Sequence, residues 1–287
     1  MLWHHATGTL SLDKPRLLGI VNVTPDSFSD GGRLRTVDDA RRHVEQLVRE
    51  GADVLDIGGE STRPQGALPV SADEELRRVM PVIEAVRRDV PNVPVSIDTV
   101  KARVAAEALA AGASIVNDVS GFRLDDGMAA VCARASAGVV LMHSRGDVAE
   151  MGTFLHASYG EDPVADVLAE LRRCAAEAEE GGIAPERIAI DPGIGFAKRV
   201  EHSLAMLHDL ARFCELGYPV LVGVSRKRFI GELTGVASAH QRVGGTVGAN
   251  VAALERGARL FRVHDVKPSR DALDVAWAIM HQPAHAS

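Results

Sequence analysis

Short apolar runs alternate eight times with longer amphipathic segments, and this alternation constrains the fold more than any other feature of the sequence. The runs predict buried strands over Arg16–Val23, Ala52–Ile57, Val93–Asp98, Ser114–Val119, Gly138–His143, Arg187–Asp191, Pro219–Val224 and Arg259–Val263. The segments between them predict helices over Val37–Glu50, Ala72–Asp89, Lys101–Ala110, Asp126–Ala135, Asp162–Gly181, Glu201–Leu216, His240–Arg256 and Ser269–His281. Strands that are apolar on both faces and alternate with helices are typical of a parallel sheet.

Eight such units in roughly 250 residues match the size of a (β/α)8 TIM barrel. We predict this fold in preference to a doubly wound open sheet, which is the alternative. No linker rich in Pro, Gly or Ser interrupts the pattern. We therefore expect a single domain over residues 1–287, with a short lead-in at residues 1–15 in which His4 and His5 are solvent-exposed.

Charge and cysteine content narrow the classes of partner and compartment. The net charge is −7, which argues against nucleic acid or an anionic membrane as a partner of the whole surface. The three cysteines show no metal-ligand spacing, and the first residues do not form a signal peptide. We therefore expect reduced thiols, a cytoplasmic location and no membrane-spanning segment.

Every predicted strand ends in a polar or ionisable residue. In chain order these residues are Asn22, Asp56, Asp98, Asn117 with Asp118, His143, Asp191, Ser225 with Arg226 and Lys227, and Arg262 with His264. The C-terminal strand ends of a TIM barrel form one face, and that face carries the active site. One strand-end aspartate is as often a cap or a turn residue, and His143 alone is equally well explained as a histidine packed at the rim. Eight converging polar ends are costly to bury unless they are paired or bind a ligand.

The residue types at these ends also suit particular ligands. Asp98, Asn117 and Asp191 supply acceptors for a flat heterocycle with amino and amide edges, and Lys227 supplies donors. Arg262 and His264, together with Asn22, suit an anion, since barrels often bind phosphate after their last two strands. Gly193-Ile194-Gly195 predicts a turn with positive φ rather than a phosphate loop, because the glycine pattern is incomplete.

Eight segments together resemble the signature motifs of the dihydropteroate synthase family. They are NVTPDSFSDGG, DIGGESTRP, SIDT, NDVSG, LMHSRG, DPGIGF, GVSRKRFIG and RVHDV, in the family's order between Gly19 and Val266. The resemblance implies a TIM barrel with long mobile loops after its first and second strands. It also implies an enzyme of folate biosynthesis that condenses 6-hydroxymethyl-7,8-dihydropterin diphosphate with 4-aminobenzoate, releasing pyrophosphate.

The resemblance further implies a role for each matching residue. The pterin-binding positions are Asp98, Asn117, Asp191, Lys227 and Arg262. The 4-aminobenzoate pocket takes Phe28, Thr62, Pro64 and Arg228, and the pyrophosphate site takes Asn22, Arg262 and His264. Asn22 also binds the cofactor Mg²⁺. The catalytic set is Asn22, Asp30, Thr62, Arg63, Lys227, Arg262 and His264. Apart from the resemblance, we interpret Asp56 as structural support beneath the second loop rather than as a ligand.

The sequence departs from the family pattern at two positions near the 4-aminobenzoate pocket. Gln65 separates Pro64 from Gly66, and Arg228 stands where some members have a serine that meets the aminobenzoate carboxylate. Arg228 either pairs with that carboxylate or points away from it. Sulfonamides, which mimic 4-aminobenzoate in size and charge, are the expected inhibitors.

Three other functions remain open on sequence grounds. A pterin-binding methyltransferase shares the Asp and Asn positions but does not need Lys227, Arg262 and His264 arranged for a diphosphate. A catalytically silent paralogue predicts eroded loops, and a zinc hydrolase predicts a His-x-His at the end of the first strand. For the synthase we expect pyrophosphate to leave before the neutral aniline attacks, and a homodimer formed through the late helices.

Overall fold

The computed structural model describes residues 1–23, 37–61 and 69–282 of the chain, and eight parallel strands form its centre. These are β3 (Arg16–Asn22), β4 (Val54–Gly58), β5 (Val95–Asp98), β6 (Ile115–Asp118), β7 (Gly138–Met142), β8 (Ile188–Asp191), β9 (Leu221–Val222) and β10 (Leu260–Val263). Their order in the sheet is β8-β7-β6-β5-β4-β3-β10-β9. A parallel bridge between Ile190 and Val220 joins the two edges, and the Ile190 N–H donates to the Pro219 carbonyl at 2.9 Å. The predicted TIM barrel is confirmed.

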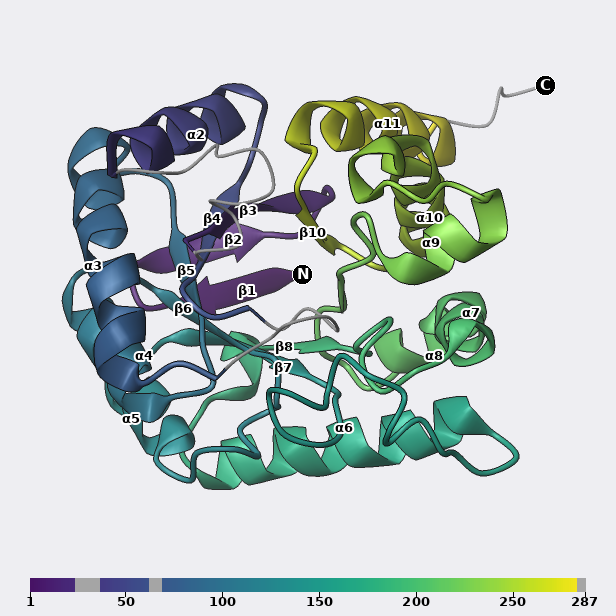
Figure 1. The fold of residues 1–287 in the computed structure, drawn as a ribbon, viewed down its shortest axis with the longest axis horizontal. Helices are drawn as coiled ribbons and strands as arrows, with labels where there is room; N and C mark the ends of the chain where they lie inside the picture. The colour runs from purple at the N-terminus through teal and green to yellow at the C-terminus, as the bar shows by residue number, and fades with distance from the viewer. Residues whose placement is uncertain (24–36, 62–68, 283–287) are drawn as a thin grey trace.

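Helices surround the strands (Figure 1). They are α2 (Val37–Arg49), α3 (Ala72–Asp89), α4 (Ala102–Ala110), α5 (Met128–Arg134), α6 (Pro163–Glu180), α7 (Val200–His208), α8 (Leu210–Cys214), α9 (Arg228–Thr234), α10 (Val243–Glu255) and α11 (Val266–Met280). Asp162 caps α6 by accepting from the Val164 and Ala165 amides, with Pro163 at the first position. No helix among the described residues has the length and hydropathy that a bilayer crossing demands.

Four helical details differ from the sequence prediction. Helix α10 begins at Val243 rather than at His240, because His240 lies in a separate 3-10 turn over Ala239–Gln241. The segment predicted as one helix over Glu201–Leu216 is two helices, because the chain leaves helical geometry at Asp209 (φ −99°, ψ 25°). Helix α9, which has seven residues and directly follows the end of the seventh barrel strand, was not predicted. Helix α11 begins at Val266, three residues early, because Pro268 falls in its first turn, where a missing N–H costs nothing.

Residues along each strand alternate between the outer face, which packs on helices, and the barrel interior. The interior positions nearest the strand starts form one apolar cluster: Leu18, Val54, Ile115, Val140, Ala189, Leu221 and Leu260. The outward neighbours, such as Leu17, Leu55 and Phe261, belong to the larger cluster under the helices. On most of these strands the next interior position lies two residues beyond the apolar one. It therefore lies at or near the C-terminal end of the strand.

A hairpin closes the end of the barrel at which the strands begin. It consists of β1 (Leu2–His5) and β2 (Gly8–Ser11), which pair antiparallel (Figure 1). Trp3 is completely buried in the apolar interior cluster, and its indole N–H donates to the Arg187 carbonyl at 2.9 Å. The expectation that His5 is solvated was wrong, because this packing leaves His5 only 6% exposed.

Candidate active site

A polar layer lies inside the barrel directly above the apolar layer. Strand alternation points Asn22, Asp56, Asp98, Asn117, Asp191 and Arg262 to the interior, and all but Asp98 stand two or four residues beyond an apolar interior residue of the same strand. Asp56 is fully buried, and Asn117 and Asp191 are 3% and 4% exposed. The structure thus brings together the described residues that the sequence assigned to pterin binding.

Arg262 links two acids across the barrel. Its Nε donates to Oδ2 of Asp56 at 2.6 Å, and one terminal nitrogen donates to Oδ2 of Asp98 at 2.6 Å. The Asn117 amide nitrogen donates to the same Asp56 oxygen at 3.3 Å. The other Asp56 oxygen is buried without a hydrogen-bond partner among the described residues. Asp56 therefore fixes the arginine and the asparagine, while its predicted role beneath the second loop stays a prediction, because residues 62–68 lie outside the described residues.

Burial and charge shift the protonation of this cluster. Burial raises the pKa of Asp98 to about 7, since the attraction of Arg262 only partly offsets desolvation and the nearby Asp56 charge adds to it. Burial disfavours the charge on Arg262, but attraction to Asp56 and Asp98 outweighs burial and raises the pKa of the guanidinium. The cluster thus holds a permanent cation beside a carboxyl group that titrates near neutral pH.

Asp191 and Lys227 form the opposite side of the layer. Oδ1 of Asp191 accepts from the Gly193 N–H at 2.7 Å. Burial raises the pKa of Asp191, and the charge of Lys227 counteracts this effect. Burial lowers the pKa of Lys227 to about 8 against the attraction of Asp191. The Lys227 ammonium donates to the Ile194 carbonyl and lies 4.4 Å from the centre of the Phe196 ring.

Gly223 lies next to both Asp191 and Arg262. Gly223 occupies the interior position beyond Leu221, and a Cβ on it would lie 3.7 Å from Oδ2 of Asp191 and 3.9 Å from Cβ of Arg262. The glycine therefore leaves the space between these two groups unfilled by a side chain of its own. Sequence reasoning missed Gly223 and Phe196, although a glycine in register with the other interior positions was a readable signal.

Asn22 and His264 lie on neighbouring strands at the same end of the barrel. Asn22 is the last residue of β3, in register with Gly58, and β3 pairs with β10. His264 follows β10, and its backbone N–H and ring Nδ1 lie 3.1 Å and 3.0 Å from the Ser225 hydroxyl. Ser225 thus orients the imidazole that the sequence assigned to the anion.

The predicted 4-aminobenzoate pocket is only partly described. Phe28, Asp30, Thr62, Arg63 and Pro64 lie outside the described residues. Arg228 begins α9, and its guanidinium lies 3.9 Å from the centre of the Phe154 ring while Nε lies 3.3 Å from the Glu232 carboxylate. The aromatic partner Phe154 was not foreseen, because it comes from a loop far away in the sequence.

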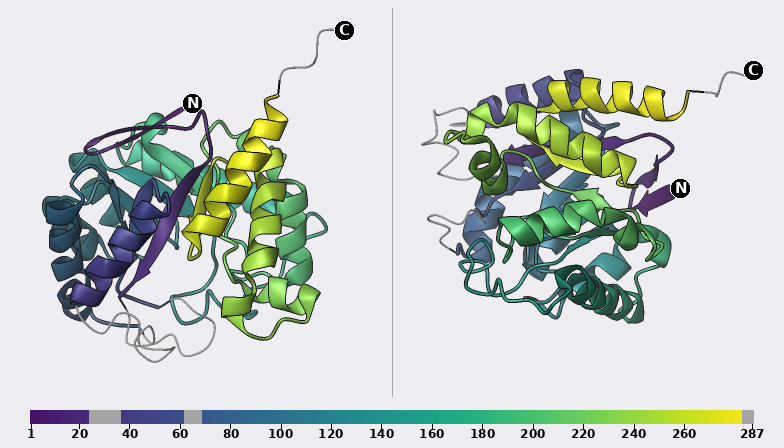
Figure 2. Two further views of the ribbon diagram at one scale, coloured as in Figure 1. Left: turned by 90° about the horizontal axis from the view of Figure 1, so that it is seen from above. Right: turned by 90° about the vertical axis from the view of Figure 1, so that its right-hand side faces the viewer.

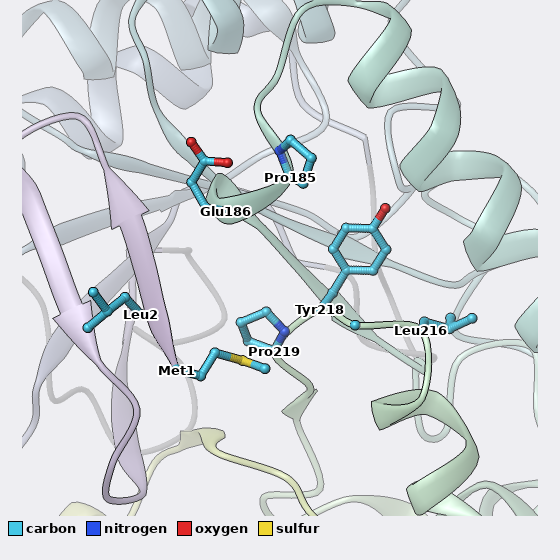
Figure 3. A pocket seen from close by; sticks show the side chains of 8 residues that line it. Met1, Leu2, Pro185, Glu186, Leu216, Tyr218 and Pro219 are labelled. Atoms are coloured by element: carbon cyan, nitrogen blue, oxygen red, sulfur yellow. The ribbon is translucent and has the colours of Figure 1, made fainter.

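A hollow of about 420 Å³ opens at the other end of the barrel (Figure 3). Its lining residues precede β1, β8 and β9 or lie next to them: Met1, Leu2, Pro185, Glu186, Leu216, Gly217, Tyr218 and Pro219. The lining is mostly apolar and contains none of the strand-end residues that the sequence assigned to the site. The polar layer at the C-terminal strand ends is therefore the candidate active site.

Comparison with known proteins identifies close relatives over nearly the whole chain. The family model described as "Pterin binding enzyme" matches residues 18–264. A dihydropteroate synthase of Neisseria meningitidis serogroup C is 46% identical over 280 residues, which cover 96% of each chain. The solved dihydropteroate synthase of Xanthomonas albilineans with 4-aminobenzoic acid is 49% identical, with a TM-score of 0.88 and 96% of each chain covered. The Thermus thermophilus enzyme in complex with 6HMPPP is 43% identical, with a TM-score of 0.83 over 98% of this chain and 100% of that one.

Proposed function

The chain belongs to the dihydropteroate synthase family of pterin-binding enzymes, and from this membership we propose which side chains bind each substrate and how they act. It is a transferase of folate biosynthesis that binds a pterin substrate and 4-aminobenzoate. The observation that carries the assignment of residues is the pairing of Arg262 with Asp56 and Asp98 in one layer with Asn117 and Asp191.

In this proposal the pterin lies in the space beside Gly223. Asp191, whose Oδ2 faces that space, accepts from the amino group and a ring N–H, while Asn117 and Asp98 meet the other polar edges. The Lys227 ammonium donates to a ring carbonyl or nitrogen. Arg262 covers one face of the ring, and its side chain is already fixed by two acids, so little conformational entropy is lost on binding.

We assign the diphosphate to Arg262, His264 and Asn22. Two of the five N–H donors of Arg262 are used by Asp56 and Asp98, so the fork can still present donors to an anion. Ser225 holds the His264 ring in place from its Nδ1 side. We assign the 4-aminobenzoate carboxylate to Arg228, which would exchange its contact with Glu232 for the substrate.

Mg²⁺ is the cofactor that the family generally uses, and the residues present are compatible with it. No cluster of three or more His, Cys, Asp or Glu side chains able to hold a metal occurs in the described part of the chain. Mg²⁺ needs no such cluster when it keeps several waters and takes substrate oxygens as ligands. The Asn22 amide oxygen would then be its protein ligand. When bound, Mg²⁺ neutralises charge on the leaving pyrophosphate.

The residues act by positioning and electrostatics. Arg262 and His264 stabilise negative charge as the bond to pyrophosphate breaks, while Asp191 and Asn117 keep the electron-rich dihydropterin in place. The neutral amine of 4-aminobenzoate then attacks the same carbon. An aniline nitrogen is nucleophilic without prior deprotonation, so the amine loses its proton only after the new bond forms.

A pyrophosphate-release assay tests the function. The enzyme should release pyrophosphate from 6-hydroxymethyl-7,8-dihydropterin diphosphate only when 4-aminobenzoate is present, with one dihydropteroate formed for each pyrophosphate. A silent paralogue would bind the pterin without release, and a methyltransferase would instead consume a methylated folate.

The order of bond breaking has its own test, which uses substrate labelled with ¹⁸O at the bridging oxygen. Label should scramble into non-bridging positions without 4-aminobenzoate if pyrophosphate leaves first.

A homodimer through α10 and α11 is the proposed assembly. The two helices pack side by side on one flank (Figures 1 and 2), and α11 exposes Val275 (61%) and Ile279 (72%). On α10, a Cβ at Gly244 or Gly248 would meet no atom within 4 Å. An apolar face with small residues suits close packing of a second copy. Light scattering should find a dimer for the native chain and a monomer for Ile279→Glu. Leu155→Glu, at an exposed leucine elsewhere, should remain dimeric.

A further inference from the structure

The loop between β8 and α7 carries three groups of the active site. Asp191 ends the strand, the Ile194 carbonyl accepts from Lys227, and the Phe196 ring lies under the Lys227 ammonium. The backbone has positive φ at Gly193 (67°), Gly195 (80°) and Ala197 (47°), so the predicted turn at the two glycines is confirmed. Alanine in this region is strained, and such a conformation persists only where neighbouring groups hold it.

Lys198 holds this loop from the side away from the pterin space. It is only 1% exposed, and its ammonium donates to the Phe196 carbonyl at 3.2 Å and to Nδ1 of His143 at 2.8 Å. Burial lowers the pKa of Lys198 well below its ordinary value, with Asp191 and Glu170 opposing the effect and Lys227 and Arg145 adding to it. A lysine buried at this cost is kept in place by its specific partners.

His143 connects Lys198 to helix α6. Because Nδ1 accepts from Lys198, Nε2 carries the ring proton and donates to the Glu170 carboxylate on α6 at 3.1 Å. Burial, and next the charge of Lys198, lowers the pKa of His143 to about 4, so the ring is neutral at physiological pH. The histidine is thus a packed rim residue with defined donor and acceptor sides, rather than a ligand-facing group.

Arg145 and Tyr159 connect Glu170 back to the loop between β8 and α7. Glu170 accepts from Arg145 at 2.5 Å, and the Arg145 guanidinium lies 4.2 Å from the centre of the Tyr159 ring. The Tyr159 hydroxyl donates to the Ala197 carbonyl at 3.0 Å. Ala197 and Lys198 are adjacent, so the network holds the strained residue at its carbonyl and at the next side chain.

We propose that Lys198 is a positioning residue for the pterin, which acts through His143 and the loop to fix Asp191, Ile194 and Phe196. The inference rests on the proposed pterin site, since it names what keeps that site aligned. Lys198 touches no substrate. Gly193 fits the same account, because a Cβ there would lie 1.9 Å from the His143 carbonyl oxygen and 3.5 Å from the Lys198 ammonium, so the loop and the end of β7 approach as closely as glycine permits.

The experiment compares Lys198→Met with the native enzyme, since methionine keeps much of the stem and removes the ammonium. Calorimetry with 6-hydroxymethylpterin, which cannot react, should show affinity weakened about tenfold, because the loop loses both hydrogen bonds that the ammonium makes. In steady state, KM for the pterin diphosphate should rise by a similar factor while KM for 4-aminobenzoate stays within twofold. A purely structural role would lower the melting temperature and the active fraction. It would leave the pterin affinity and the KM for the pterin diphosphate of the folded enzyme unchanged. That outcome overturns the proposal.

Two further proteins make the test decisive. Lys267→Met alters an exposed lysine paired with Asp271 and should bind the pterin as the native enzyme does. Tyr159→Phe removes only the hydroxyl on Ala197 and should weaken pterin binding in the same direction by a smaller factor. If Lys198→Met does not fold, Tyr159→Phe decides, and unchanged affinity in that variant refutes the proposal. Native enzyme that fails to bind the pterin at all would refute the proposed function itself.

Discussion

Replacing Asp98 with asparagine should make the protein more stable at alkaline pH and, at the same time, a poorer binder of pterin. Asp98 is 15% exposed at the side chain, and its Oδ2 accepts from Arg262 at 2.6 Å. Asparagine has nearly the same shape and keeps an acceptor for Arg262. It removes the negative charge that Asp98 carries close to Asp56.

The magnitude follows from the pKa of about 7 in the folded protein. An unfolded aspartate has a pKa of about 3.9, and each tenfold difference in proton affinity between the two states is worth about 1.4 kcal/mol. Between these two values the folded state binds more protons than the unfolded state, so stability falls as pH rises through that window. At pH 8 the native protein should have lost about 4 kcal/mol that the Asp98→Asn variant retains.

Urea unfolding between pH 4 and pH 8.5 measures this difference. The stability gap between the variant and the native protein should be near zero at pH 4, grow up to about pH 7 and then level off. Asp271→Asn, which changes an exposed acid on α11, should differ from the native protein by under about 0.5 kcal/mol throughout. The same Asp98→Asn protein should bind 6-hydroxymethylpterin about 2 kcal/mol more weakly, because a charge-assisted acceptor is lost. If the variant is less stable than the native protein at pH 8, the attraction of Arg262 exceeds the cost of burial and the reasoning fails.

Three other substitutions test the remaining parts of the site. Asp191→Asn should weaken pterin binding by about 2–4 kcal/mol in calorimetry, since one of two charge-assisted acceptors becomes a donor; affinity within threefold of native would contradict the assignment. Arg262→Lys keeps the charge but loses the planar fork that spans Asp56 and Asp98, so kcat/KM should fall at least about tenfold, and native turnover would show that the fork is dispensable. Gly223→Ala places a Cβ in ordinary contact with Asp191 and Arg262, so the melting temperature should hold while KM for the pterin diphosphate rises; unchanged KM would mean that the ring lies elsewhere.

The strands and the interior site could be predicted because their signals are local. Each strand is a short apolar run, and the residue two beyond an interior-facing apolar residue must face the interior as well. Strand ends and barrel topology therefore located Asp98, Asn117, Asp191 and Arg262 without any knowledge of contacts.

The missed features depend on contacts between distant parts of the chain. Lys198 and His143 are 55 residues apart, and although His143 stands out as a strand-end residue, nothing in either segment predicts that the two are in contact. The partner of Arg228 is Phe154, which lies in a long loop without periodicity. Helix α9 and the N-terminal hairpin are too short to carry a pattern, and tertiary packing stabilises both.

The hairpin leads to a prediction about the end of the barrel opposite the active site. Trp3 seals the apolar layer, and that layer separates the charged layer from solvent at the strand starts. Trp3→Ala removes a completely buried side chain and its bond to Arg187, so it should cost about 3–5 kcal/mol of unfolding free energy. Leu2→Ala, at a neighbouring residue of the same strand that is 54% exposed, should cost under about 0.5 kcal/mol. Because Trp3 packs in the apolar cluster and its indole bonds to the Arg187 carbonyl, KM and kcat per folded molecule should stay native in both variants. A change in KM for the pterin diphosphate in Trp3→Ala would show instead that the two layers are coupled and that the barrel does not separate stability from binding.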